Sequence, residues 1–326
     1  MNARPNRLRG GIQAPRVVSL GGGHGLFASL SALRRLTTEL TAVVTVADNG
    51  GSSGRLREEL GVLPPGDLRM ALAALCGDDS WGRTWADVLQ HRFSSEGDLH
   101  QHAVGNLLIV ALWDLLGDHV KGLDLVGELL GAQGRVLPMS SVPLTIEAEV
   151  RMGTAVRTVR GQVEVASTNG SVLAVSLDPA DPPACPEAVA AIEEADWIVI
   201  GPGSWFTSVI PNLLVPGLRD ALLRTSAKKI VVLNLGEQPG ETDGFTGENH
   251  LEVLMTHAPE LVIDVVLADE SHRSDALGLE RAAKILGASV EICDVASKQS
   301  ATEHDPLLLA AAFKHILART PHPGRA

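Results

Sequence analysis

Apolar positions in this chain form short runs that alternate with longer segments of helical spacing. The run RVVSL at 16–20 ends in glycines, and Leu26, Leu30 and Leu33 follow it at helical spacing. A short apolar run beside such a segment is typical of a buried parallel strand and its crossover helix. The pattern resumes after residue 196. It predicts strands at 16–20, 40–46, 197–200, 229–235, 261–267 and 289–294, and helices at 26–36, 187–195, 211–224, 247–257, 276–286 and 306–318.

Two intervening segments depart from this alternation. Residues 67–131 have helical periodicity and predict a helical block, with helices at 67–75, 81–92, 102–116 and 123–130. Residues 135–177 alternate in polarity and are rich in β-branched residues, which predicts a small antiparallel β section with strands at 145–150, 155–159, 162–166 and 171–177. We therefore predict one α/β domain over residues 16–320, a doubly wound, Rossmann-like parallel sheet with these two additions. Residues 1–15 and 321–326 are expected to be disordered tails.

The composition narrows the classes of function. The 326 residues are 45% apolar, enough for a sizeable core, and carry a formal net charge of -12. Since general nucleic-acid binders are usually basic, we expect no nucleic-acid partner. No run of 18 apolar residues and no apolar secretory segment occur, so we expect a cytoplasmic protein without a membrane span. The three widely spaced cysteines fit a reducing compartment.

Glycine-rich loops follow several predicted strands, at the edge where ligands bind to open parallel sheets. The first loop is GGGHG at 21–25. Backbone amides without neighbouring Cβ atoms approach anions closely, and the following helix N-terminus favours negative charge. The spacing matches neither the Rossmann fingerprint nor a P-loop. We expect Gly22, Gly23, His24 and Gly25 to contact a phosphate or a sugar; a plain tight turn is the alternative.

The second loop is DNGGSSGRLR, which follows the predicted strand at 40–46. Its carboxylate, amide, hydroxyl and guanidinium groups suit a phosphorylated ligand, and a mobile surface loop is the alternative. The candidate ligand contacts are Asp48, Asn49, Gly50, Gly51, Ser52, Ser53 and Arg55. Asp48 is also the candidate metal ligand. In the next turn, PPGDLR, Asp67 is a candidate helix N-cap and Arg69 is a further candidate contact.

Two more loops complete the predicted site. In HAVGNLL, Gly105 costs about 1 kcal/mol relative to alanine in a helix, which the approach of a ligand or of another backbone would explain. Asn106 could bind a base edge or a sugar hydroxyl, while helix packing is the alternative. GPGSWFTSVIPN places hydroxyls between a strand and a helix, as anion sites do. Its candidates, with the residue that ends the next strand, are Gly201, Gly203, Ser204, Thr207, Ser208 and Asn234.

No common catalytic signature accompanies these loops. The motifs G-x-S-x-G and H-E-x-x-H and the kinase motifs are absent from the sequence, so we assign no catalytic residue. The residues alone predict a protein that binds a phosphorylated small molecule at one sheet edge. A dinucleotide-dependent oxidoreductase is a weaker alternative, because the glycine spacing differs from G-x-G-x-x-G.

Together these segments resemble the bacterial gluconeogenesis factor family. The resemblance rests on LGGGHGL, TAVVTVADNGGSSGRLR, PPGDLRMALAAL, GNLL, GRVLPMS, GPGSWFTSVIPNLLVPGL and NLGEQPGET, and runs from about residue 16 to the final helix. The family is similar in fold to the 2-phospho-L-lactate transferases of coenzyme F420 biosynthesis. Two positions depart from its usual pattern. His24 replaces a threonine, and Asp48–Asn49 replaces a pair of aspartates.

The resemblance implies a cytoplasmic protein that binds a UDP-sugar, principally UDP-N-acetylglucosamine. It also implies a role that links carbon metabolism to cell-wall precursor supply and cell shape, with the glucosamine-6-phosphate synthase as a regulated partner. We further expect a homo-oligomer. The alternative is a magnesium-dependent transferase with Asp48 on the metal. Because hard cations prefer anionic oxygen ligands, the loss of one carboxylate at Asn49 weakens that alternative.

Overall fold

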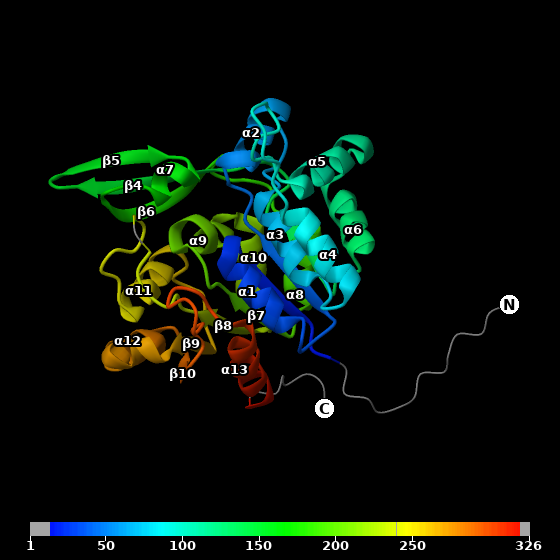
Figure 1. Cartoon of the computed structure of the whole chain (residues 1–326). Coiled ribbons are helices and arrows are strands. Elements are labelled where there is room, and N and C mark those ends of the chain that lie inside the picture. The colour runs from blue at the N-terminus through cyan, green and yellow to red at the C-terminus, as the bar shows by residue number, and fades with distance from the viewer. Residues whose placement is uncertain (1–13, 239, 320–326) are drawn as a thin grey trace, which may run out of the picture.

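A seven-stranded parallel sheet forms the centre of the computed structural model, which describes residues 14–238 and 240–319 (Figure 1). Neighbouring strands pair in parallel throughout. The predicted doubly wound α/β fold is confirmed. Apart from residues 14 and 15, the tails expected at 1–15 and 321–326 lie outside the described residues. The strands are, in spatial order, β10 (Ser289–Cys293), β9 (Val265–Asp269), β8 (Lys228–Val232), β7 (Trp197–Ile200), β1 (Val17–Gly21), β2 (Leu40–Val44) and β3 (Arg135–Pro138).

Helices cover both faces of this sheet. On one face α1 (Gly23–Leu33), α3 (Gly66–Leu75) and α13 (Pro306–Arg319) pack together. The other group comprises α8 (Pro186–Glu194), α9 (Ile210–Leu214), α10 (Pro216–Arg224), α11 (Gly247–His257) and α12 (Ala276–Ile285). The chain leaves β1 toward β2 but leaves β7 toward β8, and right-handed crossovers therefore place the two sets of helices on opposite faces. The strand order reverses between β1 and β7, which is the topological switch point.

A run of helices lies beside α3 in Figure 1, and the last of them packs against β3. It contains α4 (Ser80–Gln90), α5 (Val104–Leu116) and α6 (His119–Leu130). One more helix, α2 (Gly51–Leu60), occupies most of the stretch that we expected to be a glycine loop. The reason is local: RLREEL after the glycines consists of good helix formers, and Gly61 ends the helix in the left-handed region at φ 66°.

The small antiparallel sheet has the order β5 (Ala155–Arg160), β4 (Thr145–Met152), β6 (Ser171–Asp178). Two predictions in this region are wrong. Residues 135–138 form the parallel edge strand β3, because their buried apolar side chains pack as in the other parallel strands. Residues 162–166 form the short helix α7 (Gln162–Ala166) instead of a strand. A five-residue segment has too few turns for its periodicity to distinguish the two.

The predicted helix at 211–224 is interrupted. A π-helical turn, η1 (Trp205–Val209), runs into α9, and α10 begins only after the extended residue Val215. Pro216 causes the break, because it has no N–H and restricts the residue before it to an extended backbone. A 3₁₀ segment, η2 (Glu270–Asp275), similarly precedes α12. In the described part of the chain, no helix combines the length and the apolar character needed to cross a bilayer.

Candidate functional site

A cavity of about 480 Å³ lies at the switch point of the sheet. Most of its lining comes from three segments that follow β1, β7 and β8, namely residues 22–25, 202–204 and 234–238. Single residues from other elements complete it. These are Asp67, Gln162, Ser208, Thr302 and His304. The carboxyl ends of parallel strands beside a switch point are the usual ligand site of such folds.

The first glycine loop, GGGHG, and the fourth, which begins GPGS at residue 201, are in direct contact at this cavity. A Cβ atom at Gly25 would overlap the carbonyl oxygen of Pro202, and Gly203 has a φ of 144°. Glycine is therefore required for the close approach of the two loops. The amide groups of His24 and Gly25 belong to the first turn of α1, so they have no intrahelical carbonyl partner. They supply N–H donors and the positive end of a helix dipole at the cavity.

Asp67 is one of the ionisable residues of the cavity wall, together with His24, Glu237 and His304. Burial and the nearby carboxylate of Asp48 raise the pKa of Asp67 to about 7, while the Gly23 N–H and the guanidinium of Arg69 oppose this change. Protein surrounds the carboxyl group, but the residue keeps an exposed edge at the cavity. The predicted N-cap role of Asp67 is wrong, since Pro65 is the N-cap and Asp67 accepts from the first turn of α1 instead.

Asp48 lies beside Asp67 and near the guanidinium groups of Arg57 and Arg69. Its Oδ1 accepts from the Gly50 N–H at 2.8 Å, and Ser53 donates to the same carboxylate. Burial raises the pKa of Asp48, while these hydrogen bonds and the guanidinium groups of Arg57 and Arg69 oppose the rise. Two neighbouring carboxylates, one of them with a pKa near neutrality, form a pair that a divalent cation would stabilise. Within residues 14–238 and 240–319, however, no three His, Cys, Asp or Glu side chains cluster as a metal site.

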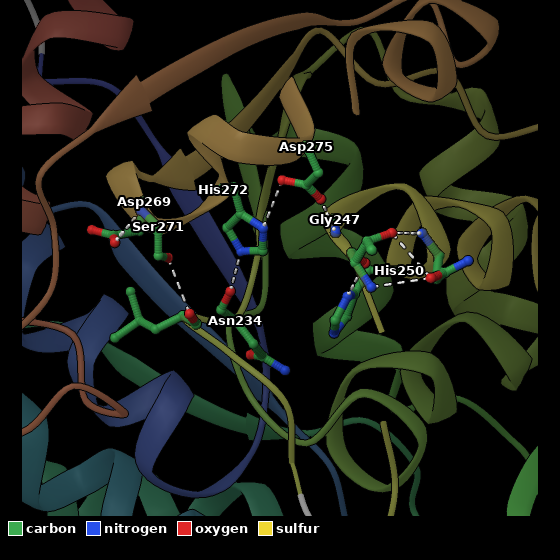
Figure 2. Close-up of polar contacts among 10 residues, drawn as sticks. Asn234, Gly247, His250, Asp269, Ser271, His272 and Asp275 are labelled. Atoms are coloured by element: carbon green, nitrogen blue, oxygen red, sulfur yellow. Dashed lines mark hydrogen bonds and ion pairs between the residues drawn. The ribbon is translucent and has the colours of Figure 1, made fainter. Parts of the chain in front are cut away.

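Asn234 holds the fourth glycine loop in place from the end of β8. Its Oδ1 accepts from the Gly203 N–H at 3.0 Å, and its Nδ2 donates to the Gly203 carbonyl at 2.9 Å. Figure 2 shows that His272 of η2 bonds to the main chain of Asn234. His272 Nε2 donates to the Asn234 main-chain carbonyl at 2.8 Å, and Asp275 lies 3.8 Å from Nδ1 of the same ring. The carboxamide of Asn234 is thus a positioning group for the cavity wall.

The hydroxyl groups that follow Gly203 are less available to a ligand than the sequence predicts. Glu241, almost fully buried, accepts from the Phe206 N–H at 3.1 Å and from Thr207 Oγ1 at 2.6 Å. Burial raises the pKa of Glu241, and these hydrogen bonds oppose the rise. Thr207, a predicted ligand contact, therefore binds an internal carboxylate, whereas Ser204 and Ser208 line the cavity. Gly201 at φ 78° shapes the turn without lining the cavity.

The third predicted loop belongs to a buried polar network outside the cavity. Ser52 Oγ accepts from the Ala103 N–H at 3.2 Å and from Asn106 Nδ2 at 3.0 Å, and it lies 3.0 Å from His102 Nδ1. Arg69 Nε donates to Asn106 Oδ1 at 2.9 Å. A Cβ atom at Gly105 would lie 2.8 Å from Arg69 Cγ, so side-chain packing explains this glycine.

The remaining candidates of the second loop bind other segments. Asn49 bonds to α7, and Arg55 donates to the carbonyls of Asp98 and His100 at 3.1 and 2.6 Å. Gly50 is the N-cap of α2, and Gly51, at φ 49°, is its first residue. Neither they nor Ser53 line the cavity.

Several lining residues lie outside the sequence prediction. Gln162, Pro202, Thr302, His304 and the segment 235–238 all line the cavity without having been predicted. Burial lowers the pKa of His304 to about 4, against the opposing effects of Asp269 and of the Leu233 carbonyl. The GPG and NLGEQ motifs indicate only Pro202 and the residues after Asn234. Gln162, Thr302 and His304 reach the cavity only through folding.

A second cavity of about 540 Å³ lies at the amino ends of β1, β2 and β3. It is the larger of the two, but its lining contains Glu39, Glu187 and Glu194 and neither of the two glycine loops. Its arginines, Arg16 and Arg135, already pair with carboxylates. The cavity at the switch point is therefore the better candidate for an anionic ligand.

Comparison with known proteins agrees with the fold. The family model for 2-phospho-L-lactate transferase CofD matches residues 17–306. This chain belongs to that family. It is 53% identical over 310 residues to a gluconeogenesis factor of Mycobacterium tuberculosis, covering 93% of this chain and 90% of that protein. Identity to the gluconeogenesis factor of Bacillus subtilis is 38% over 265 residues, or 81% and 82% of the two chains. The resemblance to the gluconeogenesis factors is thereby confirmed.

A solved structure shows the same architecture within this family. The crystal structure of a UPF0052 family member from Bacillus halodurans matches with a TM-score of 0.83 and 34% sequence identity. The match covers 93% of this chain and all of the other. At this identity and coverage, the CofD-type arrangement of sheet and helices is shared by both proteins.

Proposed function

We propose that this protein is a UDP-sugar-binding regulator of the gluconeogenesis factor type, with UDP-N-acetylglucosamine as its principal ligand. It would link carbon metabolism to the supply of cell-wall precursors, and through it to cell shape. The observation that supports this proposal most is the contact of two glycine loops at the switch point, beside a cavity of about 480 Å³. Small-molecule sites commonly have volumes of ~300–1,000 Å³.

The polar groups of the cavity suit the parts of a nucleotide-sugar. The diphosphate would lie at the first turn of α1, where the amides of His24 and Gly25 and the helix dipole favour negative charge. Among the described lining residues none is a lysine or arginine. The ligand charge would therefore be stabilised by N–H donors and the helix dipole, while partial protonation of Asp67, whose pKa is about 7, would reduce the repulsion of the ligand.

Isothermal titration of the full chain with UDP-N-acetylglucosamine, UDP-glucose and UDP tests this proposal. We expect micromolar binding of at least one UDP-sugar, and a loss of about tenfold or more in Asn234→Ala, which frees the Gly203 loop. Gln133→Ala, an exposed position outside the cavity, is the control. Millimolar or absent affinity for all three ligands would refute the proposal.

The Asp48–Asp67 pair favours a second candidate, a magnesium-dependent transferase. Mg²⁺ is commonly held by one or two carboxylates together with substrate phosphates, so Asp67, which lines the cavity, and Asp48, which lies beside it outside the lining, would be the residues to hold such an ion. The ion would neutralise the charge that develops on a leaving diphosphate. Asp67→Asn separates the two functions. It should strengthen metal-free binding of the anion in a regulator, but abolish magnesium-dependent release of nucleotide from candidate donors in a transferase.

A further inference from the structure

One short helix of the antiparallel section reaches the cavity. Gln162, the first residue of α7, is the only described lining residue that comes from residues 145–178. Its side chain is partly exposed at the cavity. A primary carboxamide donates two hydrogen bonds and accepts two, so it can bind hydroxyl and amide groups without a charge. The question is what fixes α7 at this position.

The carboxamide of Asn49 docks α7 onto the segment after β2. Its Oδ1 accepts from the Val163 N–H at 3.0 Å, and its Nδ2 donates to Glu164 Oε2 at 2.8 Å. Only a neutral amide can do both, because an aspartate would have no donor and would face the Glu164 carboxylate. Val165 adds a fully buried apolar contact from the same helix.

A second segment packs against the other end of α7. A Cβ atom at Gly240, which has a φ of 85°, would overlap the Ala166 carbonyl oxygen, so the loop after β8 lies directly against the end of the helix. The helix also contacts η1, which follows the fourth glycine loop. The helix that carries Gln162 is thus held by contacts from three parts of the chain.

The lining beside α7 and the lining that follows β8 differ in part of their chemistry. Asp67 and Gln162 both border the segment 48–50, since Asp67 interacts with Asp48 and α7 docks at Asn49. Carboxyl and carboxamide groups are suited to hydroxyls, which both donate and accept. The segment that follows β8 adds Glu237 and Gln238, but it also offers the apolar side chain of Leu235 and the bare backbone of Gly236. A planar base fits the surface of Leu235 and Gly236 better than a hydroxyl-rich ring does.

We infer that α7 forms the sugar end of the site, with Gln162 bonded to a hydroxyl or acetamido group of the ligand and Asn49 as the positioning residue that docks α7. This inference rests on the proposed UDP-sugar binding and names the groups that read the sugar. It requires that α7 variants change the affinity for UDP-sugars and leave the affinity for UDP itself unchanged.

Titration of Gln162→Ala with UDP-N-acetylglucosamine and with UDP is the direct test. We expect the affinity for the UDP-sugar to fall about 3- to 10-fold, the effect of one or two lost hydrogen bonds, and the affinity for UDP to stay within about twofold. Gln133→Ala, the same change at an exposed position outside the cavity, should alter neither. Equal losses for both ligands, or no loss for either, would overturn the role of Gln162.

The docking role of Asn49 is tested by exchanging the carboxamide of Asn49 with the carboxylate of Glu164. Asn49→Asp keeps the acceptor for Val163 N–H but sets two carboxylates together. Because the pair is exposed, we expect only about a 2- to 5-fold loss of UDP-sugar affinity, larger at low salt. The double variant Asn49→Asp/Glu164→Gln restores a donor–acceptor pair and should recover the affinity. Glu164→Gln alone completes the cycle.

The outcomes separate the inference from the proposal beneath it. If the wild-type chain binds neither UDP nor a UDP-sugar, the proposed function fails and the inference with it. If the wild type binds the UDP-sugar but Glu164→Gln does not rescue Asn49→Asp, only the docking role of Asn49 is overturned. A rescue seen for the UDP-sugar and not for UDP supports the whole inference, since a general loss of folding would affect both ligands.

Discussion

Replacement of Asp67 by asparagine should stabilise the folded protein at neutral and alkaline pH. The pKa of Asp67 is about 7, roughly three units above its ordinary value, because burial and Asp48 disfavour the ionised form. Each unit corresponds to about 1.4 kcal/mol, so ionisation of Asp67 in the folded protein costs at most ~4 kcal/mol. Its exposed edge at the cavity lowers this value, and we expect about 2 kcal/mol. The asparagine Oδ1 can still accept from the Gly23 N–H.

The pH dependence gives the prediction its sign. A carboxyl group whose pKa is raised on folding contributes stability that is full below about pH 4 and is lost as the pH rises through about 7. The difference in free energy of unfolding between Asp67→Asn and the wild type should therefore be near zero at about pH 4. It should rise to ~2 kcal/mol in favour of Asp67→Asn above about pH 8. His304 has the opposite effect. Because the pKa of His304 is about 4 in the folded protein, stability is lost as the pH falls below the ordinary pKa of histidine, 6.5. The pH dependence of wild-type stability alone therefore does not isolate the effect of Asp67.

Urea unfolding of the two proteins, from about pH 4 to about pH 9, measures this difference. Asp87→Asn removes a carboxylate from an exposed position on α4 and should change stability by less than ~0.5 kcal/mol at every pH. If Asp67→Asn is less stable than the wild type at about pH 8, or if the difference does not grow with pH, then burial does not destabilise the ionised form of Asp67.

Three further changes probe the loops. In thermal unfolding, Gly25→Ala should destabilise the fold by ~1–3 kcal/mol, because its Cβ would overlap the Pro202 carbonyl. The control Gly127→Ala in α6, where a Cβ has room, should be neutral or slightly stabilising. Ser52→Ala should cost ~1–3 kcal/mol in the same assay, since it leaves buried donors without an acceptor. Asp48→Ala should weaken UDP-sugar binding by titration, and unchanged binding would place the ligand away from this loop.

The glycine loops illustrate how far a local pattern leads. The motifs GGGHG and GPGS predict anion contact at a strand edge, and the structure brings these two loops together at one cavity. The same logic applied to Gly105 fails, because that glycine accommodates the Arg69 side chain. A glycine indicates that something approaches the backbone closely, but the sequence does not say whether the neighbour is a ligand or another side chain.

The helix α7 shows the opposite case. Its five residues alternate in polarity and predict a strand, yet Asn49, more than a hundred residues away along the chain, bonds to the Val163 N–H of the helix. Short segments have nearly equal local preferences, so a few tertiary contacts decide between them. Glu241 is similar. Nothing beside it in the sequence indicates that its carboxylate binds the start of η1.

The sequence by itself determined the layered α/β fold, because the periods of helices and parallel strands are written in consecutive residues. It also determined that glycine-rich turns follow β1 and β7, which fixes the rim where a ligand would bind. The tertiary structure alone decided which side chains line that cavity: Asp67, which lies beside Asp48, Gln162 from the antiparallel section, and His304 from the segment before α13. Such neighbours are set by the packing of whole elements, and no local spacing in the chain records that packing.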